Sequence, residues 1–435
     1  MKINRREVLF AGGLSLLTRA LVPGQTAAPA GARPDASRGP EARLLEALQR
    51  NRLPLTMGDT PAGSGWDWLV REAKAARFTL IGEEHGVAET AQFSAALWLA
   101  LRGSGYGRMA IELSPPIAEF VETAARRDGL KGIEDLLKTP GLFTFYNLRE
   151  EAKFLADVIK AAAATKGNER VLWGLDREVF SDRYLISRLE TRVPQRARAA
   201  VTRLKQASAN AWTRYGQTRN PDDMFLLAED PALVSAVRVA WPDPDNESDS
   251  ILRTLEESLA IETAERTGGM WPYMQRRTKW NRDNFAARLK EEQGRKVPPK
   301  VLMKFGLNHM VRGANYVNVF DLGAMADEVA ALTGDRAFHI IVLPSPGSRQ
   351  AVPGAGRSFG SVATDDFDDF NARDGRLTRM LPNSEATGHE VIDLRALRPT
   401  AMRGLEGWNP DVIRTIYGYD AALIWKAAHA SSGLE

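Results

Sequence analysis

The sequence predicts an α/β protein with a mainly parallel central sheet, flanked by helices and interrupted by a large helical insertion between the third and fourth core strands. Short apolar runs that resemble strands alternate with stretches of helical spacing, which is the pattern of consecutive βα units. Residues 181–294 break this alternation, because they show helical periodicity and few β signals. Two of the short apolar runs lead into a Gly-x-x-His pattern, which places imidazoles directly after predicted strands.

The composition is ordinary for a globular protein, with 44% hydrophobic and 26% charged residues in a chain of 435. The formal net charge is +3, and residues 1–30 carry as much by themselves, so the remainder is near neutral. Nucleic-acid binding is therefore not expected. The chain has no cysteine, which excludes disulfides, thiolate metal sites and cysteine nucleophiles.

The N-terminal region has the features of an export signal. The twin-arginine pair Arg5-Arg6 precedes an apolar run, Val8–Leu17, and small-residue cleavage candidates follow at residues 28–32. This run is too short and too rich in glycine to span a bilayer. We therefore expect residues 1–35 to be a twin-arginine signal peptide and linker, and the protein to be periplasmic or secreted, with no stable membrane insertion after signal removal. The alternative is a basic tail without a targeting role.

Three strands are predicted in the first part of the α/β core, residues 41–180. They cover Phe78–Ile81, Met109–Ile111 and Val171–Trp173. Helical spacing follows the first strand from Val87 to Leu101. Pro116 is well placed in the first turn of the next helix, and Asn147 is a candidate N-cap for a third helix.

The helical insertion, residues 181–294, is expected to form a cap over one end of the sheet. Its tryptophans are candidates for lining a substrate pocket, namely Trp212, Trp241, Trp271 and Trp280. They could equally fill the cap's own core. The second part of the α/β core, residues 295–435, contains the predicted strands Lys300–Phe305, His339–Leu343 and Ala421–Trp425.

Carboxylates and imidazoles follow four of the predicted strands. In chain order they are Glu83, Glu84 and His85 after the first strand, Glu112 after the second, Asp176 after the third, and Asn308 and His309 after the fourth. In open parallel α/β sheets, ligands bind outside the carboxyl ends of the strands. We therefore expect His85 and His309 to lie close together, although more than two hundred positions separate them in the chain.

Such a set of side chains has two chemical uses. His85, Glu112 and His309 could ligate a divalent metal such as Mn, Co or Zn, which would polarise a carbonyl and activate water. Without a metal, a carboxylate-oriented histidine could take a proton from water while a second histidine or an arginine stabilises the oxyanion. Each residue also has a structural interpretation: His85 as a helix cap, Glu112 as a partner of Arg108, and Asp176 as a turn residue.

The motif-bearing residues resemble those of the erythromycin esterase, ChaN, Tiki and TraB superfamily. Residues 80–89 resemble its opening motif, and Glu112 is similar to its second-strand glutamate. Gly174-Leu175-Asp176 resembles its third-strand motif, residues 281–285 resemble the helix before its last motif, and residues 304–309 are similar to its closing histidine motif. The resemblance spans residues 78–313, and the order and spacing of the motifs make it fairly specific.

The resemblance implies a hydrolase, esterase-like or metal-dependent and peptidase-like, that acts on a small-molecule or peptide substrate. His85 would be a general base or metal ligand, with Glu83 or Glu84 as its partner, and Glu112 and His309 would complete the site. ChaN-type members imply an alternative, a haem- or metal-binding protein without catalysis that uses one of the two histidines as an axial ligand.

Two further features separate the branches of the superfamily. The helical insertion and Arg282 suit the esterases, where the arginine would orient Glu112 or an anionic intermediate, although it could equally pair with Asp283 on a helix surface. The esterase pattern has another histidine at the position of Gly306, and the two Gly-x-x-His motifs are Tiki-like. Asp176 and Asn308 are expected to lie in the second shell or at the substrate.

Overall fold

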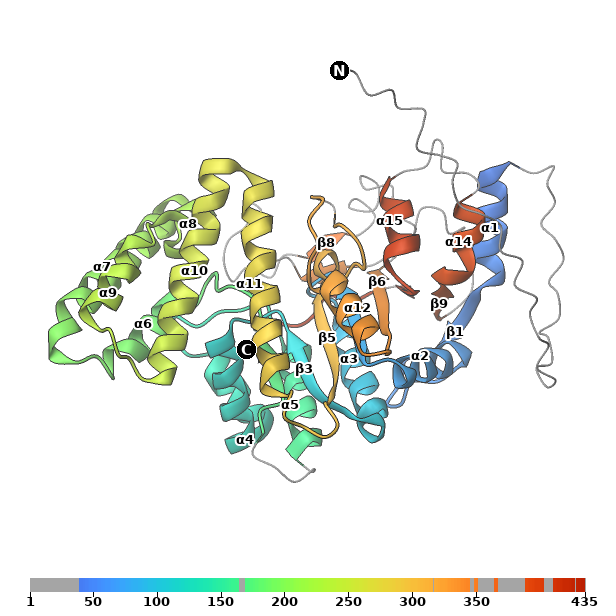
Figure 1. Cartoon of the computed structure of the whole chain (residues 1–435), viewed down its shortest axis with the longest axis horizontal. Helices are drawn as coiled ribbons and strands as arrows, with labels where there is room; N and C mark the ends of the chain where they lie inside the picture. The colour runs from blue at the N-terminus through green and yellow to red at the C-terminus, as the bar shows by residue number, and fades with distance from the viewer. Residues whose placement is uncertain are drawn as a thin grey trace, which may run out of the picture. The chain divides into compact units, whose positions relative to one another are not determined.

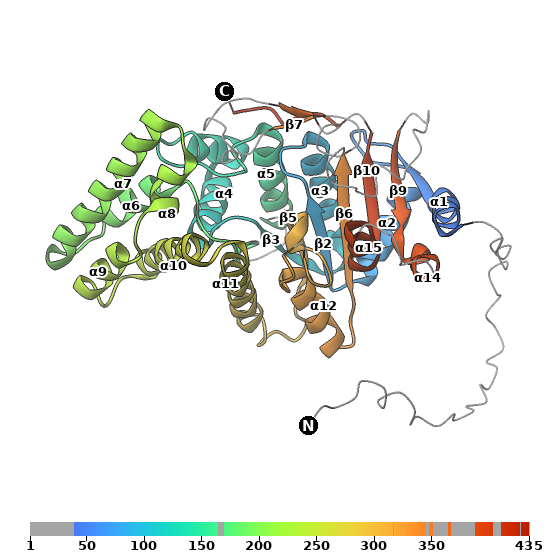
Figure 2. The same ribbon diagram turned by 90° about the horizontal axis from the view of Figure 1, so that it is seen from above.

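This computed structural model describes residues 39–163, 169–315, 317–344, 348–350, 364–366, 388–402, 410–426 and 428–434. The predicted signal peptide and linker, residues 1–35, lie outside these ranges. From Pro40 onward the described residues belong to one unit, built on an eight-stranded sheet with helices on both faces (Figures 1 and 2). No helix among the described residues is long and apolar enough to cross a membrane.

The strands lie in the order β1-β9-β10-β6-β2-β5-β3-β4. Their bounds are Arg52–Leu55 (β1), Phe78–Glu83 (β2), Tyr106–Ile111 (β3), Leu172–Gly174 (β4), Lys300–Gly306 (β5), Ala337–Pro344 (β6), His389–Asp393 (β9) and Ala421–Trp425 (β10). The six strands expected from the sequence are all present, as β2 to β6 and β10, and they pair in parallel with one another. The predicted α/β class with a mainly parallel sheet is confirmed.

One edge of the sheet was not predicted. There β1 and β9 pair antiparallel with each other, and β9 pairs antiparallel with β10. Pro54 lies within β1, and a proline weakens any strand prediction because it cannot donate to a ladder. An edge strand tolerates it, since one side of β1 has no partner strand. A separate two-stranded sheet consists of β7 (Ser348–Gln350) and β8 (Thr364–Asp366).

Helices of the core form a layer on each face of the sheet (Figure 2). Their bounds are Pro40–Arg50 (α1), Ser64–Ala75 (α2), Ala88–Leu101 (α3), Pro115–Leu137 (α4), Arg149–Ala163 (α5), Leu322–Leu332 (α12), Arg398–Ala401 (α14) and Pro410–Gly418 (α15). Alternate strand residues face the two layers: Ile81 packs with residues of α2 to α5, and its neighbour Leu80 packs with residues of α1, α12 and α15.

Asn147 does not cap α5 as expected. Its side-chain oxygen accepts from the backbone N–H of Thr144 at 2.8 Å, and its nitrogen donates to the carbonyl of Leu137 at 2.7 Å. The side chain therefore closes the loop that leads to the helix, which competes with capping because asparagine bonds readily to nearby backbone groups.

The region between β4 and β5 is helical, as the sequence predicts. It contains α6 (Asp182–Glu190), α7 (Arg198–Thr218), α8 (Phe225–Ala228), α9 (Ala232–Ala240), α10 (Asn246–Gly268) and α11 (Met270–Glu291). The helices α10 and α11 pack against each other; α10 also contacts α4, and α11 also contacts α12 and β4. Helix α11 therefore connects the insertion with the core and leads directly into β5 (Figure 1).

Gly174, the last residue of β4, tests how tightly β4 packs against the start of α4. A Cβ atom there would lie 2.6 Å from the carbonyl oxygen of Ser114 and 2.7 Å from Cβ of Ala118. We expect Gly174→Ala to lower the free energy of unfolding by about 1–3 kcal/mol, because overpacking forces the backbone apart. Urea unfolding would measure this. Gly103→Ala is the control, since a Cβ there meets nothing within 4 Å; equal stabilities of the two variants would contradict the prediction.

Candidate active site

The strand ends bring the expected side chains to one rim of the sheet. Glu83 ends β2, Glu112 follows β3, Asp176 follows β4, and His309 ends the short helix η4 (Leu307–His309) that follows β5. Because β2, β5, β3 and β4 are neighbours in parallel, these ends lie side by side. All four side chains are buried.

The carboxylate of Glu112 lies at the centre of the rim. Its Oε2 accepts from the backbone N–H of Gly306 at 2.6 Å and lies 3.3 Å from Nε2 of His85. Its Oε1 accepts from Nη2 of Arg277 at 2.8 Å and lies 3.6 Å from Nε2 of His309. One carboxylate thus bridges both imidazoles, and the expectation that the two histidines lie close together is confirmed.

The two imidazoles have a strong effect on the pKa of Glu112. Although burial raises its pKa, His85 and His309 hold the pKa of Glu112 well below its ordinary value. Arg108, the structural partner considered from the sequence, does not contact it. Arg108 pairs instead with Glu292 at 2.6 Å and Glu169 at 3.0 Å.

His85 is held at both ring nitrogens. Its Nδ1 donates to Oε1 of Glu83 at 3.0 Å, and its ring stacks on Phe145 with 5.0 Å between centroids. Burial lowers the pKa of His85, but Glu112 and then Glu83 outweigh it and raise the pKa to about 10. His85 does not cap α3, whose N-cap residue is Val87.

His309 has a carboxylate partner that the sequence analysis missed. Its Nδ1 donates to Oδ2 of Asp321 at 2.6 Å, and Asp321 is completely buried. Burial lowers the pKa of His309, but Asp321 and Glu112 together outweigh burial and Arg277, so the net shift is upward. Asp321 is also the N-cap of α12, where it accepts from the backbone N–H of Leu322. An aspartate before an apolar helix signals such a cap, but nothing in the sequence links it with His309.

Arg277 occupies the role that the sequence analysis gave to Arg282. It binds Asp176 through Nε, at 3.0 Å, and through Nη2, which also donates to Glu112. Arg282 has no hydrogen bond or ion pair with these residues in the described part of the chain, and it does not line the cavity next to them. Five residues along an α-helix correspond to a rotation of about 140°, so the two arginines of α11 face different directions.

Asp176 supports the site without reaching the cavity. It holds Arg277, and despite burial this guanidinium lowers the pKa of the Asp176 carboxyl. Asp176 is absent from the cavity lining, whereas Glu112 and Arg277 belong to it. Asp176 therefore holds Arg277 in position without lining the cavity itself.

A buried lysine lies beneath His85. The Lys304 side chain is completely buried, and its Nζ donates to Oε1 of Glu83 at 2.7 Å and to both oxygens of Glu151, at 2.8 and 3.0 Å. Burial raises the pKa of Glu151 to about 7, whereas Lys304 and His85 hold the pKa of Glu83 below its ordinary value against burial. Glu83 is therefore the carboxylate fixed next to His85.

Glu84 has a different partner. Its Oε2 accepts from Nη1 of Arg349 at 2.8 Å, so Glu83 rather than Glu84 orients His85. The two glutamates follow one another at the end of a strand, where consecutive side chains point to opposite sides.

A cavity of about 390 Å³ lies above these side chains. From the core it is lined by Glu83, Glu84, His85, Glu112, Phe145, Arg177, Val179, Gly306, Leu307, Asn308 and His309, and from the insertion by Glu265, Met270, Tyr273, Met274 and Arg277. The insertion thus covers the site as expected, but none of the four tryptophans lines this cavity. Trp241 is buried in the main hydrophobic core, and Trp271 is 52% exposed.

The arrangement of donors does not fit a divalent metal on His85, Glu112 and His309. In each imidazole, the Nε2 nitrogen faces a carboxylate oxygen of Glu112. The guanidinium of Arg277 lies 2.8 Å from the carboxylate that a metal would have to share. Among the described residues, no group of three or more histidines and carboxylates is arranged to hold a metal ion.

Gly306 lies close to two ionised groups of the rim. A Cβ at this position would lie 3.1 Å from Nε2 of His85 and 3.3 Å from Oε2 of Glu112. A larger side chain would press on both groups. In this chain the position contributes its backbone N–H to Glu112 instead.

No protein-family model matches the sequence, and no curated protein matches it. Solved structures do share its fold. A protein from Bacillus cereus is 15% identical, with a TM-score of 0.55, over 90% of this chain and 99% of that one. A succinoglycan biosynthesis protein is 12% identical, with a TM-score of 0.56, over 90% and 98% of the two chains. A mutant of the erythromycin esterase EreC in its open conformation is 12% identical, with a TM-score of 0.53, over 85% and 95%.

The charge network predicts an unusual histidine titration. We expect the imidazole of His85 to lose its proton well above 6.5, near 10, and Glu112→Gln to move this midpoint toward 6.5, because Glu112 is the main group that raises it. NMR titration of the imidazole resonances would show both. Since the pKa is raised, the stabilisation from this pairing is complete below pH 6.5 and is lost as the pH rises toward 10.

Glu89→Gln is the matched control for this titration. Glu89 pairs with His429 at 2.5 Å, and the His429 side chain is 77% exposed. This substitution should leave the His85 midpoint unchanged. A midpoint of 6.5 or lower in the unsubstituted protein would show that the network does not exist in solution.

Proposed function

We propose that this chain, which has the fold of the erythromycin esterase EreC, is an exported hydrolase that activates water with a His/Glu site and cleaves an ester or amide. The proposal rests on a series of side-chain contacts. They run from Glu83 through His85 to Glu112, and from Glu112 to His309. The series lies at the carboxyl ends of parallel strands and under a cavity of about 390 Å³.

His85 is the group that transfers protons in this proposal. Glu83 fixes its Nδ1, which leaves Nε2 directed toward the cavity side, next to Glu112. When the ring is neutral, Nε2 takes a proton from a water molecule as the water oxygen attacks the substrate carbonyl. The same nitrogen then returns the proton to the leaving oxygen or nitrogen, so the acid and the alcohol or amine are released.

Arg277 and His309 supply positive charge where negative charge develops. Both line the cavity, and both approach Oε1 of Glu112. An anionic oxygen formed from the substrate carbonyl could accept from them in place of Glu112. Their own partners, Asp176 and Asp321, keep them in position during this exchange.

The cavity wall favours a substrate with an apolar part. Phe145 lies against His85, and Met270, Tyr273 and Met274 of α11 form the opposite wall. Such a wall suits the acyl or alcohol part of a small ester, or a hydrophobic peptide side chain.

The alternative of a haem- or metal-binding protein without turnover is less well supported by the site. A haem iron needs an imidazole nitrogen with a free lone pair. In His85 and His309 both ring nitrogens face carboxylates.

Substitution of His85 tests the catalytic proposal. We expect His85→Gln to lower kcat/KM by about 10²–10⁴-fold on any p-nitrophenyl ester, lactone or peptide amide that the protein hydrolyses. In the unsubstituted protein, kcat/KM should rise from neutral pH toward pH 10, because His85 acts as a base only after it loses its proton. Initial rates across this range would measure both effects.

The exposed His429 provides the control for this experiment. His429→Gln should leave the rates unchanged, and so should a chelator, because the donor set does not fit a metal. The proposal fails if His85→Gln retains full activity, if chelation abolishes activity, or if no member of the panel is hydrolysed.

The export part of the proposal depends on the twin-arginine pair. We expect replacement of Arg5 and Arg6 together by lysine to retain the precursor in the cytoplasm, because this pathway reads the arginine pair itself rather than its charge. Fractionation and immunoblotting of cells that express the full chain would measure it. Arg19→Lys, outside the pair, should be exported normally, and equal export of all three proteins would contradict the prediction.

A further inference from the structure

The charged side chains that line the active-site cavity are paired, with one exception. On the core side, each acid and each cation binds a neighbour of opposite charge. On the side of the insertion, Arg177 lies 2.8 Å from Glu262, and its Nη2 donates to the hydroxyl of Tyr273 at 2.6 Å. Glu265 is the exception: it lines the cavity, but it has no hydrogen bond or ion pair within the described part of the chain.

Glu265 lies near the end of α10, where the chain turns back into α11 (Figure 1). Gly269 makes this turn with φ at 80°, and its backbone N–H donates to the carbonyl of Glu265 at 2.7 Å. Met270 and Tyr273, in the first turns of α11, line the cavity from the same side as Glu265. This side belongs to the insertion, whereas His85 belongs to the core. Glu265 and the proposed base therefore line different sides of one cavity.

The cation next to Glu265 in the sequence is engaged elsewhere. Arg266 donates to the carbonyl oxygens of Leu227 and Glu229, and it does not line the cavity. Leu227 belongs to α8, so these bonds direct the guanidinium toward that helix. A positively charged ligand inside the cavity would therefore meet Glu265 without first displacing an ion pair.

A second carboxylate adds to the negative charge around Glu265. Glu262 lies one helical turn earlier on α10, and the guanidinium of Arg177 is its counterion. Burial raises the pKa of Glu262 against the effect of Arg177, and the nearby Glu265 adds to this upward shift. Two acids and one arginine thus occupy this part of the wall, which gives it an excess of negative charge.

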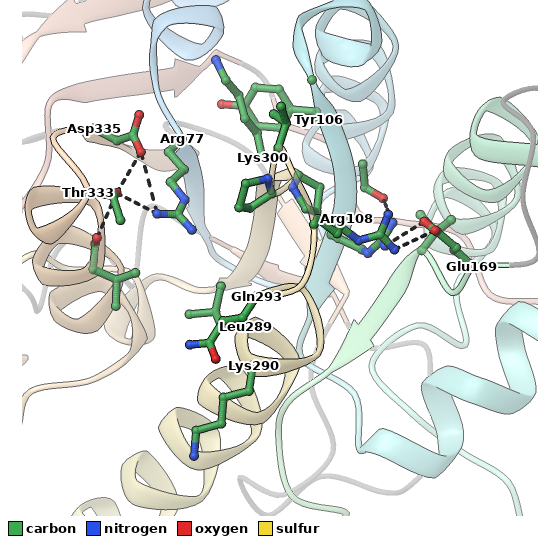
Figure 3. Close-up of a pocket in the computed structure, with 18 of the residues that line it drawn as sticks. Arg77, Tyr106, Arg108, Glu169, Leu289, Lys290, Gln293, Lys300, Thr333 and Asp335 are labelled. Atoms are coloured by element: carbon green, nitrogen blue, oxygen red, sulfur yellow. Dashed lines mark hydrogen bonds and ion pairs between the residues drawn. The ribbon is translucent and has the colours of Figure 1, made fainter.

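A larger cavity of the molecule offers a contrast. It lies at the amino ends of the strands and has a volume of about 1040 Å³ (Figure 3). Two of its arginines have carboxylate partners: Arg77 lies 3.7 Å from Asp335, and Arg108 lies 3.0 Å from Glu169. These cations are compensated within the protein, whereas Glu265 has no such partner among the described residues.

The side chains next to Glu265 suit an alkylammonium group. Met270 is 44% exposed, and Tyr273 contributes an aromatic ring to the same lining. Cations bind favourably to aromatic rings, and flexible thioethers pack well against alkyl groups of varied shape. A carboxylate on such a wall can bind the charge of an amine while its neighbours contact the carbon atoms attached to the nitrogen.

We propose that Glu265 binds a cationic amine of the substrate. This role rests on the proposed hydrolytic function, and it makes the substrate class esters or amides that carry an ammonium group remote from the bond that is cleaved. The group must be remote because the cations around Glu112 would repel it at the cleaved bond. A neutral substrate would leave Glu265 without a partner, and an anionic substrate would be repelled by it.

Matched pairs of esters test this specificity. Each pair consists of the p-nitrophenyl ester of an aminoalkanoate with four, six or eight carbons and the ester in which a methyl group replaces the ammonium group. For at least one length, we expect the ammonium ester to have a kcat/KM at least about tenfold higher than that of its methyl counterpart, because hydrogen bonds to charged groups are strong. Equal kcat/KM values within all three pairs would overturn the proposal.

Substitution locates the amine site. Glu265→Gln removes the charge and keeps the size, so the ratio of kcat/KM between the two esters of a pair should fall to about one. A purely structural defect would lower both values together and leave their ratio unchanged. Glu257→Gln is the matched control, because Glu257 lies on the same helix but pairs with Arg276 at 2.7 Å outside the cavity. The control should keep the full ratio, and an unchanged ratio in Glu265→Gln would refute the role of Glu265.

A ligand that cannot be hydrolysed separates amine binding from catalysis. Calorimetric titration of the full-length protein would compare 6-phenoxyhexylammonium with 6-phenoxyhexanol, two ethers that differ in charge. We expect the cation to bind at least about tenfold more tightly, and Glu265→Gln to remove the difference. Hydrolysis of the esters together with equal binding of the two ethers would overturn the amine site and leave the hydrolase. Binding of the cation that depends on Glu265, without hydrolysis of any ester, would overturn the hydrolase and support the amine site.

Discussion

The candidate site depends on one buried carboxylate that is surrounded by positive charge. Glu112 accepts from a backbone N–H and from Arg277, and it lies between the two imidazoles. A carboxylate this deeply buried remains ionised only if its surroundings replace water. Four strands and a helix of the insertion must therefore arrive in register for the site to exist. The packing of these elements and the ionised state of Glu112 therefore depend on the same pairing of charges.

Each cation around Glu112 has a second acidic partner. Glu83 holds His85, Asp321 holds His309, and Asp176 holds Arg277. This alternation of charges keeps the rim nearly neutral although it is densely ionised. It also fixes the direction in which each cation points, so that a substrate oxygen could replace Glu112 as the acceptor without moving the groups that receive it.

The sequence alone predicts the parallel strands and the residues that follow them, because strand signals and the rule for strand ends in parallel sheets are both local. It predicts that His85 and His309 lie close together for the same reason. It does not predict Lys304 with Glu151 or His309 with Asp321, since such pairs depend on how helices pack over the sheet. Arg277 was missed because a motif position such as that of Arg282 does not determine which side of a helix faces the site. The edge strand β1 was not predicted because Pro54 weakens its strand signal.

Arg277 belongs to the insertion, whereas Glu112 and Asp176 belong to the core. Any hinge-like movement that lifts α11 from the sheet would leave two buried acids without their shared counterion, at a cost of about 3–5 kcal/mol if nothing replaces it. Packing of the insertion on the core and assembly of the candidate site are thus thermodynamically linked. Under the proposed function, a mutation far out on the insertion that loosens the packing of α11 would reduce hydrolysis without touching any group in the cavity.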